Sequence, residues 1–308
     1  MSLPKGFPHF IIVGAQKAGT TALSYLLDRI PTLLASKAGR FWEPHFWDNS
    51  TLGNPQQWSS DERCRHLKNY FKNWNATDVK PNSILFEKTP ILLALPEVPN
   101  KIITALSHKP KIIIILRDPI ARAYSQYKMA WLRFHRKKAN GRVNRTFASF
   151  ELEVMLNAND LVTTGVMKAP SFTNYSTDWN LEDFTIVGKP TVNYVGMIER
   201  GFYAQQIRYY MEHFPLYESL KVISYEAFLR NKTGVLNELS RFIGGPYHNF
   251  SDENVTQNLS PLARSQRTLQ SVCPPPSNES KAYLKHLYKP YNDELVYLLG
   301  ESWRGIWD

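Results

Sequence analysis

Cysteine is scarce in this sequence. Only Cys64 and Cys273 are present, so the chain can form one disulfide at most and has no disulfide framework. No Cys-x-x-Cys pair occurs, which excludes the commonest sequence pattern of a structural zinc site. Whether the two cysteines pair or stay free is open from the sequence.

Long apolar runs are missing as well. No stretch approaches the ~20 apolar residues of a transmembrane helix, so we expect the chain as given to be soluble, with no membrane segment. Its first residues, MSLPKGFPH, lack the apolar core of a signal peptide. We therefore expect either an intracellular protein or one from which a leader or anchor has been removed.

Asn-x-Ser/Thr sequons, by contrast, are frequent. Such sites matter only in a lumen or outside the cell, so they favour a glycoprotein of the secretory route, although an Asn- and Ser-rich chain can also collect them by chance. The nine sequons begin at Asn49, Asn75, Asn144, Asn174, Asn231, Asn249, Asn254, Asn258 and Asn278. We expect the Golgi lumen or the secretory pathway if an anchor is missing, and the cytoplasm as the alternative.

Acidic residues are outnumbered by basic ones. The 27 Asp and Glu against 37 Lys and Arg give a net charge of +10, which attracts anions such as nucleic acid, acidic glycans or phosphorylated cofactors. From Pro119 to Phe150 there are eight basic residues and no acidic one. This segment is either a surface that draws in a polyanionic glycan or a solvated helix face. No recognised nucleic-acid motif accompanies it, so nucleic acid is not an expected partner.

Apolar runs of strand length alternate with helical patterns along the chain. Strands are predicted at HFIIVG (9–14), SILFEKTP (83–90), KIIIILRDP (111–119) and LKVISYEAF (220–228), with helices over 20–29, 120–138, 201–214 and 279–299. Continuous apolar strands that alternate with helices are typical of a doubly wound α/β fold, in which helices flank a parallel sheet.

The length and composition suit one large domain. With 308 residues and 43% hydrophobic content, we expect a single domain over 1–308. Residues 49–80 and 139–190 are polar and poorly periodic. We interpret them as excursions from the sheet, and long excursions of this kind often carry substrate contacts.

The turn after the first strand is glycine-rich. It reads Gly14-Ala-Gln-Lys17-Ala-Gly19-Thr20-Thr21, which keeps the glycine spacing of a Walker loop but places Thr20 where the Walker lysine belongs. Backbone amides at the helix N-terminus can still hold an anion, with Lys17 reaching it from inside the loop. No Walker-type metal site is evident, because Arg117 separates Asp118 from the apolar strand. A nucleoside triphosphate with Mg²⁺ is therefore a poor fit, and we expect no metal.

This displaced lysine resembles the sulfotransferase family, whose members use 3′-phosphoadenosine 5′-phosphosulfate (PAPS). The family's second motif is an apolar strand ending in Arg, with a Ser eight residues later, and IIIILRDPIARAYSQY supplies Arg117 and Ser125. FWEPHFWD (41–48) and FEKTP (86–90) resemble the Golgi carbohydrate sulfotransferases of the heparan sulfate 3-O and N-acetylgalactosamine 4-sulfate 6-O types. The resemblance implies the P-loop-NTPase-like sulfotransferase fold.

The resemblance also implies roles for individual residues. Glu43 is the expected general base, and a carboxylate suits removal of a hydroxyl proton. His45 is a second candidate base or a group that orients the acceptor, unless it is simply packed. Lys88 is expected near the sulfuryl group or acceptor, unless it is a surface lysine. The expected cofactor-binding residues are Lys17, Ala18, Gly19, Thr20, Thr21, Arg117, Ser125 and, from ARSQRTLQSVC, Arg267 and Thr268.

These observations lead to one expected function and two alternatives. We expect transfer of a sulfuryl group from PAPS to an acceptor hydroxyl or amine, with a carbohydrate or glycosaminoglycan as the first acceptor class and an anionic acceptor in either case. The first alternative is PAPS-dependent sulfation of a small-molecule natural product. The second is a non-catalytic polyanion-binding protein, and the presence of Lys17, Glu43, Arg117 and Ser125 counts against it.

Overall fold

The chain divides into two compact units. The computed structural model describes residues 7–37, 39, 42–142, 146–163, 196–244 and 273–307. One unit is built from residues 1–118 and 203–264, and the other from residues 119–202 and 265–308. The single domain expected over 1–308 stays a prediction.

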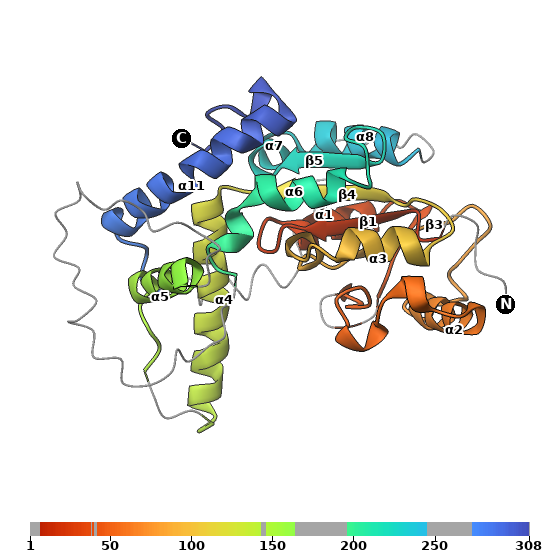
Figure 1. Cartoon of the computed structure of the whole chain (residues 1–308), viewed down its shortest axis with the longest axis horizontal. Helices are drawn as coiled ribbons and strands as arrows, with labels where there is room; N and C mark the ends of the chain where they lie inside the picture. The colour runs from red at the N-terminus through yellow and green to blue at the C-terminus, as the bar shows by residue number, and fades with distance from the viewer. Residues whose placement is uncertain are drawn as a thin grey trace. The chain divides into compact units, whose positions relative to one another are not determined.

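Five parallel strands form the sheet of the first unit, in the order β2-β3-β1-β4-β5 (Figure 1). The strands are β1 (Phe10–Gly14), β2 (Leu33–Ala35), β3 (Ile84–Lys88), β4 (Lys111–Leu116) and β5 (Leu220–Ser224). Register places Phe10 beside Phe86 of β3 and Lys111 of β4, and Ile112 beside Leu220 of β5. The predicted parallel α/β sheet is confirmed.

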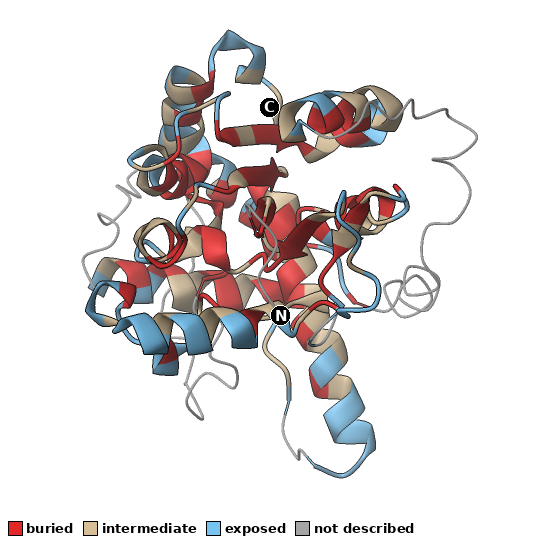
Figure 2. Cartoon of the chain, turned by 90° about the vertical axis from the view of Figure 1, so that its right-hand side faces the viewer, coloured by how far each residue is buried: buried red, intermediate tan, exposed pale blue. Residues whose placement is uncertain are grey.

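The central strands are apolar because both of their faces are covered. Every residue of β1 is buried, and so are Ile112 to Leu116 of β4 (red in Figure 2). Helix α1 packs on β1, β2 and β3, while α7 packs on β5. The helices of this unit are α1 (Thr20–Leu27), α2 (Ser60–Phe71), α3 (Val98–Ala105), α6 (Tyr203–Met211), α7 (Tyr225–Arg230) and α8 (Lys232–Ile243).

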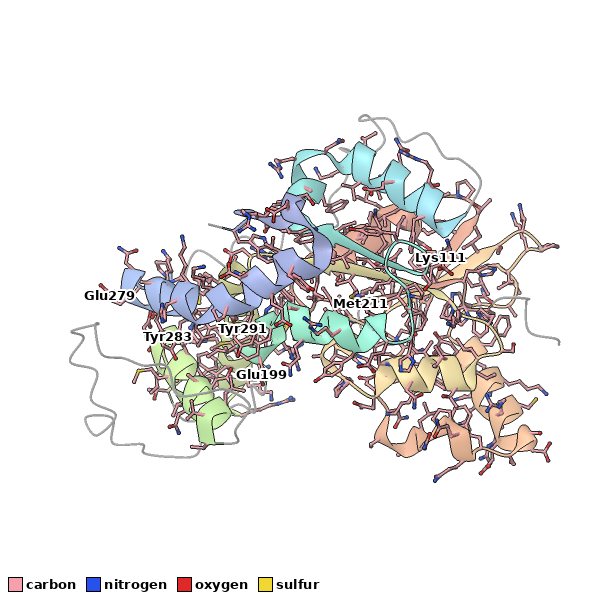
Figure 3. All side chains as sticks on the ribbon, turned by 45° about the horizontal axis from the view of Figure 1, so that its top comes forward. Lys111, Glu199, Met211, Glu279, Tyr283 and Tyr291 are labelled. Carbon is pink, nitrogen blue, oxygen red and sulfur yellow. The ribbon has the colours of Figure 1, made fainter. Side chains whose placement is uncertain are left out.

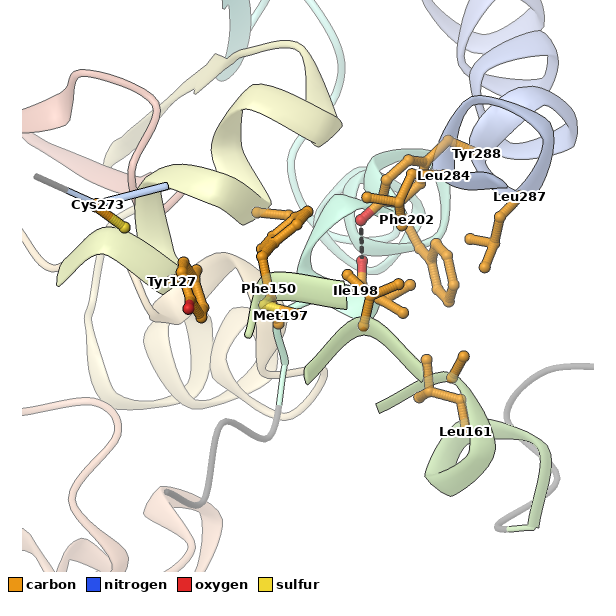
Figure 4. Packing of buried hydrophobic residues seen from close by; sticks show 13 residues of the cluster. Tyr127, Phe150, Leu161, Met197, Ile198, Phe202, Cys273, Leu284, Leu287 and Tyr288 are labelled. Atoms are coloured by element: carbon orange, nitrogen blue, oxygen red, sulfur yellow. Dashed lines mark hydrogen bonds between the residues drawn. The ribbon is translucent and has the colours of Figure 1, made fainter. Parts of the chain in front are cut away.

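The second unit is helical where it is described. Its helices are α4 (Pro119–Ala139), α5 (Phe150–Thr163) and α11 (Asn278–Leu299). They enclose an apolar cluster in which the Tyr288 hydroxyl donates to the Ile198 carbonyl at 3.0 Å (Figure 4). Tyr283 and Tyr291 of α11, labelled in Figure 3, pack against the same cluster.

The sequence located four of the five strands and four of the nine α-helices in the described part of the chain, and not all of their limits. The strand expected over 220–228 ends at Ser224, because the Ser224 hydroxyl accepts a hydrogen bond from the Ala227 amide and begins α7. The excursion at 49–80 contains α2, which begins with a capping box between Ser59 and Glu62. In the excursion at 139–190, residues 150–163 form α5, and the residues after 163 lie outside the described part of the chain.

Candidate active site

The candidate residues of the first unit lie where the strands of the sheet end. Lys17 follows β1, Glu43 and His45 follow β2, Lys88 ends β3, and Arg117 follows β4. Parallel strands bring their carboxyl ends to one edge, and ligands of open α/β sheets bind outside that edge. The fold therefore places these five side chains at the edge where chemistry is expected.

The phosphate-type loop joins β1 to α1. Gly19 takes the N-cap position of α1 with a φ of 94°, and it has no side chain with which to cap the first amides of the helix. An added Cβ at Gly19 would lie 2.6 Å from the Tyr225 ring, so glycine is required by space as well as by φ. Ala18 and Thr20 are buried, whereas Thr21 is exposed. The uncapped helix end is a favourable place for an anion.

A buried ion pair connects β3 with the segment after β2. Lys88 Nζ lies 2.7 Å from Glu43 Oε1, and the Lys88 side chain is only 2% exposed. The same ammonium group donates to the Thr21 hydroxyl of α1 at 3.4 Å. Burial lowers the pKa of Lys88, and Glu43 opposes that effect by favouring the charged form. The alternative of a simple surface lysine is thereby contradicted, because Lys88 is inside the protein.

Glu43 lies between Lys88 and His45. Its second carboxylate oxygen is 3.4 Å from His45 Nε2, and His45 Nδ1 lies 2.8 Å from Asp48 Oδ2. The His45 side chain is half exposed, so the alternative of a packed core histidine does not describe it. A histidine whose Nδ1 faces a carboxylate has a fixed ring orientation, which suits a group that assists proton transfer.

Several residues at the carboxyl edge of the sheet have strained backbone conformations. Among the described residues, four that are not glycine have a positive φ, and three of them are Lys17, Trp42 and His45 with φ of 72°, 60° and 52°. Such conformations cost free energy and persist only where surrounding structure enforces them, and they cluster at functional sites.

Arg117 is held by three neighbours within the first unit. Its guanidinium donates to the Lys17 carbonyl at 3.3 Å and lies 5.0 Å from the centre of the Tyr225 ring. Its own carbonyl accepts from the Tyr203 hydroxyl at 2.7 Å. The next amide, that of Asp118, donates to Glu226 at 3.1 Å. These contacts bring Arg117 to the loop that contains Lys17.

The remaining expected residues lie elsewhere. Ser125 is a half-buried residue of α4 in the second unit, and Arg267 and Thr268 lie outside the described residues. Cys64 is exposed and Cys273 is buried, and both thiols are free. Within the part of the chain that the structure describes, no group of three His, Cys, Asp or Glu could hold a metal ion.

The structure adds functional candidates that the sequence did not reveal. Asp48 orients His45, and the i, i+3 spacing of the two residues was the available signal. Tyr225 contacts both the loop and Arg117. Glu87, a residue of the FEKTP segment, is fully buried and accepts hydrogen bonds from other residues.

Comparisons with known proteins give the family of the chain. Residues 7–270 match the sulfotransferase domain family. The chain is 25% identical over 345 residues to membrane-associated sulfotransferase kil1 of Dictyostelium discoideum. It is also 25% identical over 317 residues to heparan sulfate glucosamine 3-O-sulfotransferase 3B1 of Homo sapiens. These alignments cover 96% and 99% of this chain and 66% of each relative, so the chain spans less than the full length of either.

A solved structure shows the same fold. The crystal structure of a sulfotransferase from Alicyclobacillus acidocaldarius superposes with a TM-score of 0.61 at 21% identity, covering 99% of this chain and 100% of that one. Because the family match extends over most of the chain, and the displaced loop lysine and Arg117 meet at one sheet edge, the chain belongs to the sulfotransferase family.

Proposed function

We propose that this chain transfers a sulfuryl group from PAPS, the donor that the sulfotransferase family generally uses, to a hydroxyl group of a carbohydrate. The observation that carries the proposal is the Glu43–Lys88 ion pair beside the loop of Lys17. It puts a proton acceptor and a buried cation next to an anion-binding helix end. A protein that only bound polyanions would not need a base at that place.

The cationic side chains and backbone amides near the loop of Lys17 suit an anionic nucleotide. The N-terminus of α1, Lys17 and the Thr20 and Thr21 positions would hold the 5′-phosphosulfate end, which supplies the transferable sulfuryl group. Arg117 would hold the 3′-phosphate by charge-assisted hydrogen bonds, and Ser125, Arg267 and Thr268 are proposed to join it. Ala18 and Gly19 would contribute backbone only.

Glu43 is the proposed base. It would accept the proton of the acceptor hydroxyl while that oxygen forms its bond to sulfur and the bond from sulfur to the 5′-phosphate oxygen breaks. The proton ends on Glu43, and the leaving group is 3′-phosphoadenosine 5′-phosphate. Lys17 and Lys88 stabilise the negative charge that grows on the leaving side, and fixed charges of this kind are often the largest catalytic contribution. His45, oriented by Asp48, would hold the acceptor or share its proton.

The acceptor class is proposed from two observations. One relative is named for heparan sulfate, a polyanionic glycan. The last turns of α4 carry exposed basic residues at Arg133, Arg136, Lys137 and Lys138, which could bind such a glycan. Arg122 is an exception to the surface interpretation of this basic segment, because it is fully buried and donates to Gln126 at 2.7 Å.

The location of the protein is likewise a proposal. No helix within the described residues is long and apolar enough to cross a membrane. One relative is named as membrane-associated, and nine sequons are present in the sequence. The sequons favour a glycoprotein of the Golgi lumen or secretory pathway.

The test is transfer of radiolabelled sulfate from PAPS to heparan sulfate, with Glu43→Gln as the variant. Loss of the base should lower turnover roughly 10²–10⁴-fold while binding of 3′-phosphoadenosine 5′-phosphate persists. Transfer to small phenols or alcohols but not to glycans would favour the natural-product alternative. Full turnover in Glu43→Gln would exclude Glu43 as the base.

A further inference from the structure

A buried carboxyl group joins the Glu43 segment to β3. Glu87 is 0% exposed, and its Oε1 accepts from Trp47 Nε1 at 2.7 Å and from the Tyr70 hydroxyl at 2.6 Å. Its Oε2 accepts from the Thr89 hydroxyl at 3.3 Å. All three donors are neutral and completely buried. Burying a carboxyl group is costly unless its hydrogen bonds are made, and these three donors make them.

The same segment contacts β3 at two successive residues. Glu43 pairs with Lys88, and Trp47, four residues further along the segment, donates to Glu87. Successive residues of a strand point to opposite faces of the sheet. Residues 43–47 therefore contact the end of β3 on both faces, through Lys88 on one face and Glu87 on the other. Phe46 adds a stacked contact with Tyr70, with ring centres 4.5 Å apart.

From this geometry we propose that Glu87 is a positioning residue for sulfuryl transfer. By accepting the Trp47 hydrogen bond, it sets where Glu43 and His45 lie relative to Lys88 and the loop of Lys17. The inference rests on the proposed function, since it takes Glu43 as the base. The positive φ values of Trp42 and His45 agree with a segment that its anchors hold in a strained shape. Burial raises the pKa of Glu87 to about 7, and either protonation state can keep the Trp47 contact, because that contact needs only an acceptor oxygen.

The test compares variants that differ in whether they break this link. Glu87→Leu removes the acceptor, and Trp47→Phe removes the donor on the Glu43 segment. Glu87→Gln keeps an acceptor oxygen and should rescue function. Tyr70→Phe is the matched control: it removes the Tyr70 hydrogen bond to the same oxygen and the longer 3.3 Å contact from Trp47 Nε1 to the Tyr70 hydroxyl, but it keeps the 2.7 Å bond from Trp47 to Glu87.

The proposal predicts a split between catalysis and cofactor binding. Glu87→Leu and Trp47→Phe should lose about 10-fold to 100-fold in kcat with heparan sulfate as acceptor, since small displacements of a catalytic group are that costly. Their Kd for 3′-phosphoadenosine 5′-phosphate should stay at the wild-type value. Glu87→Gln and Tyr70→Phe should keep wild-type kcat. Each variant is assayed under conditions in which circular dichroism shows that it is folded. If Glu87→Leu does not fold, the kcat values of Trp47→Phe, Glu87→Gln and Tyr70→Phe test the proposal.

Two outcomes would overturn the inference. One is a wild-type kcat in Trp47→Phe. The other is a loss in Tyr70→Phe that matches the loss in Trp47→Phe and follows their Tm values, as a purely structural role predicts. A wild type that neither transfers sulfate nor binds the nucleotide would instead overturn the proposed function. In that case a crystal structure of Trp47→Phe would still show whether the Trp47–Glu87 hydrogen bond positions residues 43–47. If it does, the Glu43–Lys88 contact should be broken in the variant.

Discussion

The pH dependence of stability offers a quantitative test of the Glu87 environment. Burial raises the pKa of this carboxyl group from its ordinary value of 4.5 to about 7 in the folded protein. Between these values the folded protein holds a proton that the unfolded chain has released. The unfolded state then binds fewer protons, so stability falls as pH rises. The contribution is complete below pH 4.5 and is lost as pH passes through about 7.

The size of the effect follows from the same two values. Each pH unit in this window removes about 1.4 kcal/mol, which gives a total of about 3 kcal/mol. That is a large part of the 5–15 kcal/mol that typically stabilises a domain. Glu87→Gln should remove this dependence, because an amide does not titrate and can still accept the Trp47 hydrogen bond.

Urea unfolding at pH 5 and pH 8 measures the difference. Between these conditions the wild type should lose about 2.5 kcal/mol more than Glu87→Gln does, because a small part of the contribution is already lost at pH 5. Glu153, whose pKa burial also raises to about 7, acts in the same direction in both proteins and cancels in the comparison. Tyr70, Asp48 and Tyr210 also interact with Glu87 and are common to both proteins. Parallel stability profiles for the two proteins would refute the account of a buried, titrating carboxyl group.

Three further substitutions test other contacts. Lys88→Met should abolish most turnover and also lower Tm, because it leaves the Glu43 carboxylate, only 17% exposed, without its cation, and removing one partner of a buried ion pair is destabilising; retained turnover in the folded variant would contradict the role of Lys88. Gly19→Ala should raise the Kd of the nucleotide at least about 10-fold, because Gly19 has a φ of 94° and an added Cβ would collide with the Tyr225 ring. Calorimetry measures this Kd, and a wild-type value would contradict the role of the loop. Ser59→Ala should lower the free energy of unfolding by about 1 kcal/mol through loss of the α2 cap, with kcat unchanged, and a changed kcat would connect α2 to catalysis.

The sheet and its phosphate-type loop could be predicted because their signals are local. The apolar runs of β1 and β4 reflect burial on both faces, and the following Gly14 and Gly19 mark the turn into α1. The edge strand β2 escaped prediction because only Leu33 to Ala35 take part, too few for a period to show. The sequence pattern predicts a strand over most of α7, because the beginning of this helix depends on a side-chain cap at Ser224.

The candidate site was predictable in its parts but not in its connections. The resemblance named Glu43 and Lys88 separately, and only folding shows that they pair across 45 positions of sequence. Glu87 belongs to the FEKTP motif, but the sequence gives it no role, because its hydrogen-bond donors Trp47 and Tyr70 come from two distant segments. No local pattern reports that a carboxyl group is fully buried. Ser125, Arg267 and Thr268 remain predictions of nucleotide contacts.

Binding of 3′-phosphoadenosine 5′-phosphate tests the central claim most directly. Calorimetric titration of the wild type and Arg117→Ala, with ADP as the control ligand, separates a sulfotransferase nucleotide site from an ordinary nucleotide-binding loop. The account predicts tight binding to the wild type, loss of that binding in Arg117→Ala, and weak binding of ADP. Absence of binding, or a preference for ADP, would contradict the assignment of the Lys17 loop and Arg117 to PAPS.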